Sequence, residues 1–510
     1  MGAADRISGL PDALLVRAIS FLPASDAAHT AVLSRRWRRL WPCTDAVHLD
    51  SRPYAGLDDA SLVNQRLLLD ADAALHAPGR GHVRKLSLFV AGPYGDKEYC
   101  REVLGSDSWS SRDNLVHILL DDPALHGVEE LRVAVEMKQD SLIYRFHPAV
   151  LPAGQTLRVL DLACCHLELP ARGDVSFPGL SVLRLHSCGS TMRELESLIR
   201  AAPNLGSLHI RGHYFNYDAA NSSRHDFRLH CPSLVTLTLD ISVLSIHLDT
   251  PCLRTFKYKG MFADFSMKSQ ATKPRRVELT FTIWSRPRYG EPEKPWFASL
   301  WKFLRNLRHA KILKLNVPDI KGIAVDKDEQ HKHLVTLHSL ERLELEGPSD
   351  PDDHREDATA AIAILLQCCP VMSNLHIRFS ADRFCYIRSG AEFPSDFDAS
   401  LDLFARRHSK EVRLMLEADD DSEPLPGLSD CWFSCVHNHL KNVKLQFELK
   451  EWNSFEVCLA RFFAENCMVL DILQIEDGNQ TYLSHVNHKV KRWFMKSDAA
   501  DGLVKVVTEL

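Results

Sequence analysis

The chain has 510 residues, of which 45% are hydrophobic and 25% are charged, and its formal net charge is -6. This composition is typical of a folded soluble protein and excludes a disordered or fibrous chain, and no global positive charge favours polyanions. The length exceeds one ordinary compact core, so it predicts either several domains or a repeat array that extends in one direction.

Targeting signals and cysteine usage both favour an intracellular protein. The first ten residues, MGAADRISGL, contain no apolar run of signal-peptide length, and no later stretch approaches the roughly 18 apolar residues of a membrane span. The 14 cysteines are scattered through apolar contexts, as reduced core thiols are. We expect no membrane contact. Residues 273–276 offer only a weak nuclear import signal, so nucleus and cytoplasm both remain open.

Three short helices are predicted in the first 40 or so residues. The first opens at Pro11 and is closed by Pro23. Ser25 is the expected N-cap of a second helix that runs through Val32, and Ser34 lies where the chain can turn into a third.

The stretch SRRWRRLW, residues 34–41, is two-faced on a helical wheel. The residues that share an arc of about 100° are Leu33, Trp37, Leu40 and Trp41. Arginines occupy the remainder, and we expect them to be solvated. Stacking on bases would need the aromatic rings exposed beside the arginines, so we expect no direct nucleic-acid binding. A small helical core with a basic outer face also fits this pattern.

The segment from residue 5 to 41, with Leu10-Pro11-Asp12 and AVLSRRWRRLW, resembles the F-box of plant F-box/leucine-rich-repeat proteins. That resemblance implies docking on the Skp-type adaptor of an SCF ubiquitin ligase, and through it on a cullin. The resemblance implies that the adaptor is bound through the Leu-Pro turn and apolar positions of the helices. The positions of this chain that match are Leu10, Pro11, Leu14, Leu15, Ile19, Leu22, Val32, Leu33 and Trp37. Each of them can serve either the adaptor surface or the core of the helices themselves.

Beyond residue 44 one phrase recurs, with apolar residues at its first, fourth and sixth positions. Clear copies start at 157, 180, 205, 234, 253 and 340, and weaker ones near 83, 128, 310, 372, 411, 440 and 470, with a fragment at 277. The first five clear copies start between about 19 and 29 residues apart, as leucine-rich repeats do. Each phrase predicts a strand, and the helix from 193 to 202 is the clearest return segment.

The whole chain is therefore predicted to be an α/β solenoid, in which a three-helix F-box precedes an irregular leucine-rich-repeat array. Polar, proline-rich inserts at 285–296, 347–357 and 417–427 interrupt the repeats. The segment from 435 to 495 resembles the C-terminal FBD-type region of the same plant proteins. The expected domains are 1–43 for the F-box, 44–434 for the repeats, and 435–510 for FBD-like repeats and a cap.

No motif of an active site or a cofactor is present, so we expect a non-enzymatic protein without cofactors. The one cluster with metal-ligand residue types runs from Cys431 to His439, and its ligands are spaced too closely for a tetrahedral zinc site. We expect ordinary buried cysteines there, and no metal.

A substrate face follows from the repeat phrase, because residues that alternate with inward leucines must point outward. The outward residues with the clearest charge are Arg184, His186, His209, Arg211, Lys257, Lys259, Glu344 and Glu346. They predict a basic middle and an acidic patch at 344 and 346, which suit an unidentified protein partner. Equally, they can be the solvated face of any repeat protein.

These features together favour the substrate-recognition subunit of an SCF-type ubiquitin ligase. Its repeats would hold a protein substrate for ubiquitination while the F-box holds the adaptor. The alternative is a repeat-protein scaffold that binds partners without any ligase role. The sequence gives neither the substrate nor its pathway.

Overall fold

The structure is a computed structural model of the 510-residue chain. It describes residues 7, 9–54, 60–91, 115–136, 144–147, 154–168, 175–215, 226–268, 274–282, 297–348, 355–380, 425, 427–447 and 455–477. Two units are distinguished, and each is considered separately. Unit 1 comprises 1–241, 247–253 and 267–272, and unit 2 comprises 242–246, 254–266 and 273–510.

Three short helices begin the chain, as predicted: α1 (Asp12–Ile19), α2 (Ala24–His29) and α3 (Arg35–Leu40). Ser34 caps α3, since its hydroxyl accepts a hydrogen bond from the Trp37 backbone N–H at 3.4 Å. The predicted N-cap at Ser25 is wrong. α2 begins directly after Pro23, whose carbonyl accepts the first helical hydrogen bond from Ala27 at 2.8 Å.

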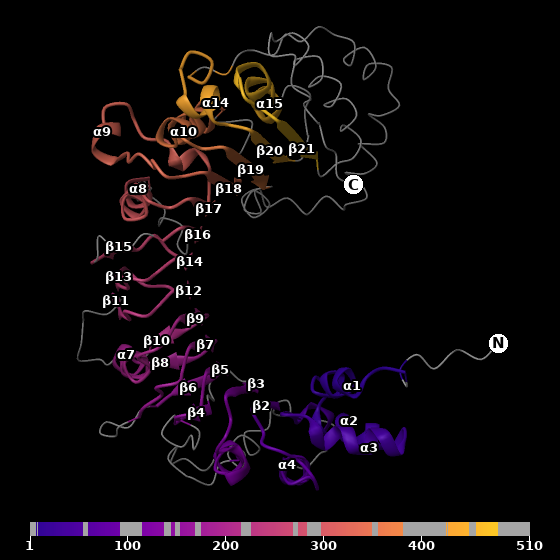
Figure 1. Ribbon diagram of the computed structural model, residues 1–510. Helices are drawn as coiled ribbons and strands as arrows, with labels where there is room; N and C mark the ends of the chain where they lie inside the picture. Colours follow the sequence, from indigo (N-terminus) through magenta and orange to yellow (C-terminus); the bar gives the residue numbers. More distant parts are fainter. Residues whose placement is uncertain are drawn as a thin grey trace, which may run out of the picture. The chain divides into compact units, whose positions relative to one another are not determined.

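Unit 1 contains a ladder of parallel strands (Figure 1). In their order along the ladder the strands are β1 (Ala46–Asp50), β2 (Lys85–Ala91), β3 (Glu130–Glu136), β5 (Val159–Ala163), β7 (Val182–His186), β9 (Ser207–Arg211) and β12 (Thr236–Asp240). Each strand pairs with the next in register, so that residues at the same place in successive repeats are lateral neighbours.

Unit 2 also contains parallel strands that pair in chain order. Its strands in order are β14 (Thr255–Gly260), β16 (Arg276–Phe281), β17 (Ile312–Asn316), β18 (Arg342–Pro348), β19 (Asn374–Ser380), β20 (Asn442–Phe447) and β21 (Ile472–Asp477). Three further short strands, β11 (Asp226–His230), β13 (Ser245–Asp249) and β15 (Asp264–Met267), lie in a stretch of chain that contributes to both units.

The repeat phrase forms strands wherever the described residues contain it. Its leucines alternate inward, as in β5, where Leu160 and Leu162 are fully buried. The weak copies near 83, 128, 310, 372, 440 and 470 also lead into strands, and β1 is a strand that the phrase did not identify. The copy near 411 and the insert at 285–296 lie outside the described residues, as does most of the insert at 417–427.

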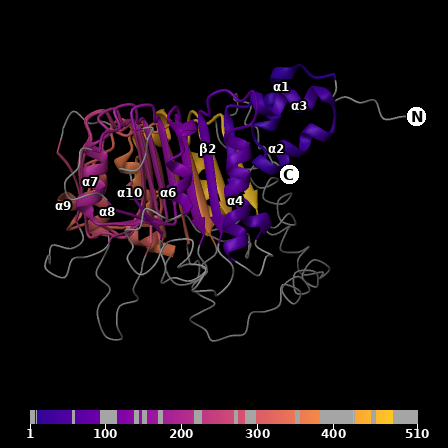
Figure 2. The same ribbon diagram turned by 90° about the horizontal axis from the view of Figure 1, so that it is seen from below.

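Helices return the chain between strands. The predicted helix at 193–202 is α7 (Met192–Arg200). Thr191 and Glu194 form a capping box at its N-terminus. Its apolar residues Leu195, Leu198 and Ile199 are buried. The other helices are α4 (Ala60–Leu75), α6 (Leu115–Leu120), α8 (Phe297–Arg305), α9 (Gln330–His333), α10 (Arg355–Cys368), α14 (Ser434–Asn438) and α15 (Phe455–Asn466). Helix α4 packs against β1, and Figure 2 shows it beside the strands of the unit 1 ladder.

A second sheet of short strands follows four strands of the unit 1 ladder, namely β3, β5, β7 and β9. It has the order β10 (Tyr214–Phe215), β8 (Gly189–Ser190), β6 (Cys165–Leu167) and β4 (Tyr144–Phe146). The chain turns into this sheet through a left-handed residue after each of β5, β7 and β9, with φ of 55° at Cys164, 50° at Ser187 and 61° at Gly212. Only the third of these is a glycine, so the first two turns are held against an unfavourable backbone preference.

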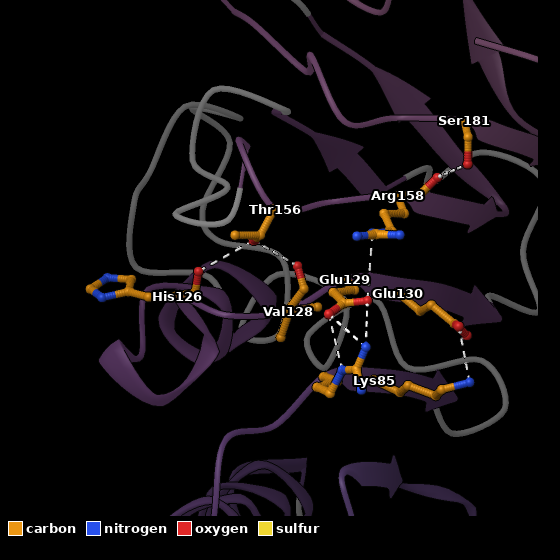
Figure 3. A network of polar contacts seen from close by, with 9 residues as sticks. Lys85, His126, Val128, Glu129, Glu130, Thr156, Arg158 and Ser181 are labelled. Atoms are coloured by element: carbon orange, nitrogen blue, oxygen red, sulfur yellow. Dashed lines mark hydrogen bonds and ion pairs between the residues drawn. The ribbon is translucent and has the colours of Figure 1, made fainter. Parts of the chain in front are cut away.

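A polar network joins the starts of successive unit 1 repeats (Figure 3). The Arg84 guanidinium donates to both carboxylate oxygens of Glu129 at 3.0 Å, and Arg158 lies 3.6 Å from the same carboxylate. The hydrogen bond from Arg84 lowers the pKa of Glu129. Thr156 donates to the Val128 carbonyl at 3.0 Å, so polar side chains as well as leucines fix the stacking of these repeats.

Buried His213 makes the stability of unit 1 sensitive to acid. Its Nε2 lies 2.9 Å from the Ser190 hydroxyl, and burial lowers its pKa from 6.5 to about 4. Between these values the unfolded chain takes up a proton that the folded chain refuses, so stability is complete above pH 6.5 and falls as the pH drops toward 4. The slope is about 1.4 kcal/mol per pH unit.

A His213→Gln variant keeps a hydrogen-bonding side chain without a titrating ring. We expect its free energy of unfolding, followed by denaturant titration from pH 7 to 4, to fall less steeply than that of the parent chain. Equal slopes in the two proteins would show that His213 does not carry this linkage.

Candidate functional site

The N-terminal helices have a small core of their own. Its buried members are Leu15, Ile19, Ala27 and Leu40, and Val16, Leu22, Trp37 and Trp41 pack partly buried against them. Two of the predicted adaptor positions, Leu15 and Ile19, are therefore interior residues that support a surface rather than form it. Leu22 and Trp37 each present part of their side chain to solvent.

Other apolar side chains on these helices and their flanking turns are exposed. We name them the apolar helical surface: Ile7, Leu10, Leu14, Phe21, Val32 and Leu33. Val32 is 82% exposed and Leu33 is 64% exposed. So many exposed apolar residues within a short segment indicate an interaction site, because a monomer gains nothing by exposing them. Pro11 is exposed beside Leu10.

Ile7 and Phe21 were missed by the sequence interpretation. Phe21 follows Leu14 and Ala18 at the spacing i, i+4, i+7, which places all three on one side of a helix. The chain still coils there, since the Phe21 N–H donates to the Ala18 carbonyl at 3.3 Å. That spacing was a signal available in the sequence.

Arg36 is not the freely solvated residue that was predicted. From α3 it donates through Nε to the Asp12 carboxylate at 2.7 Å, and through Nη2 to the Leu10 carbonyl. One guanidinium thus fastens the Leu10-Pro11 turn and the first residue of α1. Arg36 positions part of the apolar helical surface without belonging to it.

Truncation of Arg36 therefore tests how much the turn matters. We expect Arg36→Ala to weaken binding of a Skp-type adaptor about three- to tenfold, because the Leu10 carbonyl and the Asp12 carboxylate each lose a hydrogen bond from Arg36. Arg38→Ala, which removes the same charge from an exposed position of α3, should have little effect. Isothermal titration calorimetry measures both, and equal losses from the two variants would contradict the positioning role.

Trp41 anchors the helices to the first repeat. Its ring packs on the helical core, and the Arg80 guanidinium lies 5.3 Å from the ring centroid. The same guanidinium donates to the Thr44 carbonyl at 2.9 Å. On the other side His48 of β1 lies 2.8 Å from the Ser20 carbonyl. These contacts fasten α1 and α3 to the first strand of the ladder.

The unit 1 sheet brings the predicted basic residues together. Arg184 of β7 pairs in register with Asp161 on one side and His209 on the other, and His186 pairs with Arg211. His209 is occupied within the fold, because its two ring nitrogens lie 2.8 Å from the Ser207 hydroxyl and 3.1 Å from that of Thr238. The outward positions of this face that keep unoccupied donors are the arginines.

On the unit 2 sheet, opposite charges alternate across the strands. Lys257 lies 2.6 Å from Glu278, and Glu344 lies 2.8 Å from Arg342. Glu346 is 3.5 Å from Arg378. The predicted acidic patch at 344 and 346 is thus neutralised by arginines on the same and the next strand, which the repeat phrase alone did not reveal. Lys259 lies two residues after Lys257 on β14 and pairs in register with Thr280 of β16.

The segment from 431 to 439 contains no assembled metal site. Cys431 is exposed, whereas buried Cys435 donates its thiol to the Leu366 carbonyl at 3.3 Å, and His437 stacks on Trp432. Within the described ranges no group of three or more His, Cys, Asp or Glu side chains is placed to hold a metal ion. Nor is any helix in them long and apolar enough to cross a bilayer.

Two family models match the chain. An F-box domain model matches residues 7–42, which are the helical segment described above. A model described as "FBD-associated F-box protein At5g56370, LRR repeats" matches residues 116–273.

Three similar proteins of Arabidopsis thaliana are named as F-box proteins, and two of them also as LRR-repeat proteins. F-box/LRR-repeat protein At5g38396 is 25% identical over 394 residues, which are 73% of this chain and 77% of that protein. F-box protein At3g59000 is 28% identical over 395 residues, 73% of each chain. F-box/LRR-repeat protein At4g14096 is 34% identical over 270 residues, 51% of each. A crystal structure of a TLR13–ssRNA13 complex matches 78% of this chain and 52% of its own, at 11% identity and a TM-score of 0.29, too weak a likeness to carry an argument.

Proposed function

Because the chain belongs to the plant F-box/leucine-rich-repeat proteins, we propose that it is the non-catalytic substrate-recognition subunit of an SCF-type ubiquitin ligase. The apolar helical surface binds a Skp-type adaptor and through it a cullin. The repeats bind a protein substrate. The ligase partners supply the chemistry of ubiquitin transfer, which this subunit promotes by proximity.

The observation that carries the proposal is that the N-terminal helices bury some of their apolar residues in a core and expose others to solvent. Leu15 and Ile19 are buried in the core of the helices, whereas Leu14, Val32 and Leu33 are exposed. Exposed aliphatic residues of this kind, on rigid helices, are the anchors from which stable protein interfaces are built. A self-contained helical domain would have no use for them.

The attachment of these helices to the repeats supports a presenting role. The contacts of Trp41 with Arg80 and of His48 with the Ser20 carbonyl link the adaptor-binding helices to β1, at the start of the unit 1 ladder. A substrate held on that ladder would consequently keep a defined distance from the adaptor. Such a fixed distance favours transfer to a limited set of lysines.

A turnover experiment separates this function from that of a scaffold. The parent chain and a Val32→Asp/Leu33→Asp variant are expressed in plant cells, and proteins that co-purify with both are followed after synthesis is stopped. We expect at least one shared partner to persist longer with the variant, because capture continues while transfer to the ligase fails. If every shared partner kept the same half-life, the scaffold alternative would hold instead.

A further inference from the structure

Two arginines and a histidine surround one carboxylate in the unit 1 sheet. Arg132 of β3, Asp161 of β5 and Arg184 of β7 are successive lateral neighbours in one register row. Arg132 Nε lies 3.9 Å and Arg184 Nη1 lies 4.0 Å from Asp161 Oδ2, while His186 Nε2 lies 3.7 Å from Oδ1. Asp161 thus has three donor groups around it at 3.7 to 4.0 Å.

These separations are too long for hydrogen bonds. Asp161 Oδ1 is buried and accepts no hydrogen bond from any described residue. Glu129 differs, because the Arg84 guanidinium donates a hydrogen bond to each of its carboxylate oxygens at 3.0 Å. The guanidinium groups of Arg132 and Arg184 consequently retain most of their donors, and their side chains are 64% and 40% exposed.

Further positive charge lies beside this cluster. Arg211 of β9 is the lateral neighbour of His186, is exposed, and forms no ion pair with another described residue. Several charges on the unit 2 sheet form short pairs, such as Lys257 with Glu278 at 2.6 Å. The arginines of the unit 1 face, in contrast, present donors to solvent without an acceptor at hydrogen-bonding distance.

We infer that this face binds an acidic segment of the protein substrate, through carboxylates that take the free donors of Arg132 and Arg184. The inference deepens the proposed function and rests on it. Asp161 then acts as an internal carboxylate that competes with the incoming carboxylates for the two arginines. A guanidinium fork matches a carboxylate in two parallel hydrogen bonds, which an approaching Asp or Glu can complete.

The spacing of the arginines defines the pattern of acidic residues. Arg132 and Arg184 are two strands apart, which corresponds to about 9.6 Å at the usual separation of neighbouring strands. A peptide in the polyproline II conformation advances about 3.1 Å per residue with three residues per turn, so acidic residues three positions apart would lie on one side of it, over the two arginines.

Binding of synthetic peptides to the full-length protein tests the inference. The probe is a short fluorescein-labelled peptide with glutamate at every third position, and its control has glutamine at the same positions. We expect fluorescence anisotropy to show saturable binding of the glutamate peptide alone, with an affinity that falls as salt is raised. Equal binding of both peptides, or complete displacement by inorganic phosphate at matched ionic strength, would overturn it.

Two variants are expected to act in opposite directions. Arg184→Ala should weaken binding of the glutamate peptide at least about tenfold, because it removes a charge-assisted fork. Asp161→Asn should tighten binding about threefold or more, because the internal carboxylate no longer competes or repels. A merely structural ion pair would not give tighter binding, so unchanged or weaker binding by a folded Asp161→Asn protein contradicts the inference.

The control for lost charge is Arg200→Ala, at an exposed position of α7 away from the sheet face. It should leave peptide affinity unchanged, and a tenfold loss there would mean that net charge alone attracts the peptide. Co-elution of each variant with a Skp-type adaptor is measured in parallel. Intact adaptor binding without peptide binding rejects the acidic-segment inference while leaving the proposed ligase role standing.

Discussion

Replacement of Leu14 by aspartate is expected to weaken binding of a Skp-type adaptor by at least about 30-fold, which corresponds to about 2 kcal/mol. Leu14 is 50% exposed on α1, between the Leu10 turn and Phe21. A charge at the centre of an apolar interface must be desolvated without a partner, so the loss arises at the interface itself. Isothermal titration calorimetry with purified adaptor gives the affinities.

The matched control is Leu69→Asp on α4. Leu69 is 54% exposed in the same unit but lies outside the apolar helical surface, so the same substitution there should leave adaptor affinity unchanged. The circular dichroism of both variants should match that of the parent chain, because neither leucine is part of a core. If Leu69→Asp were as harmful as Leu14→Asp, the adaptor would not be reading the surface assigned to it.

One residue further along, Leu15→Ala is expected to act through stability instead. Leu15 is 1% exposed and packs against Ile19, Ala27 and Leu40. Removal of its branched end leaves a cavity in a very small core, which typically costs about 2–5 kcal/mol. Hydrogen exchange of the α1 and α3 amides reports this cost as a lower free energy of local opening.

Leu14→Ala is the corresponding control for that experiment, since it makes the same truncation at a solvent-facing position. Its effect on amide protection should stay within about 0.5 kcal/mol. The two alanine variants thereby separate core from surface at adjacent residues. Comparable loss of protection in both would mean that Leu14 supports the fold, and that its exposure is not a sign of binding.

Residue type and spacing were sufficient to predict the repeats and the three N-terminal helices. A leucine at the first, fourth and sixth positions of the phrase has few places to go other than the interior, as Leu157, Leu160 and Leu162 illustrate. Ser34 was also recognisable as a cap, because its hydroxyl reaches the N–H of Trp37 within the same turn. Such local chemistry does not depend on distant residues.

Long-range contacts account for what was missed. The role of Arg36 depends on the Leu10 carbonyl, 26 residues earlier, and the pairing of Glu346 with Arg378 depends on strand register. β1 escaped detection because Val47 and Leu49 offer only two of the three apolar positions of the phrase. No pattern along one segment shows which residues a neighbouring repeat will bring beside it.

Burial likewise separated residues that the family resemblance had grouped. Leu14 and Leu15 both match the F-box pattern, yet the packing of α3 against α1 buries only the second. The direction of a side chain around a short helix is set by which neighbour covers it, and that neighbour is known only from the fold. The candidate substrate face was divided in the same way, because cross-strand partners decide whether a charge is satisfied or free.

Co-elution of the purified full-length chain with a Skp-type adaptor in size-exclusion chromatography tests the central claim most directly. We expect a stable equimolar complex with the parent chain and its loss with Val32→Asp/Leu33→Asp, whose circular dichroism should remain that of the parent. A folded parent chain that elutes apart from the adaptor, or a complex that survives both substitutions, would contradict the assignment of the apolar helical surface to the ligase adaptor.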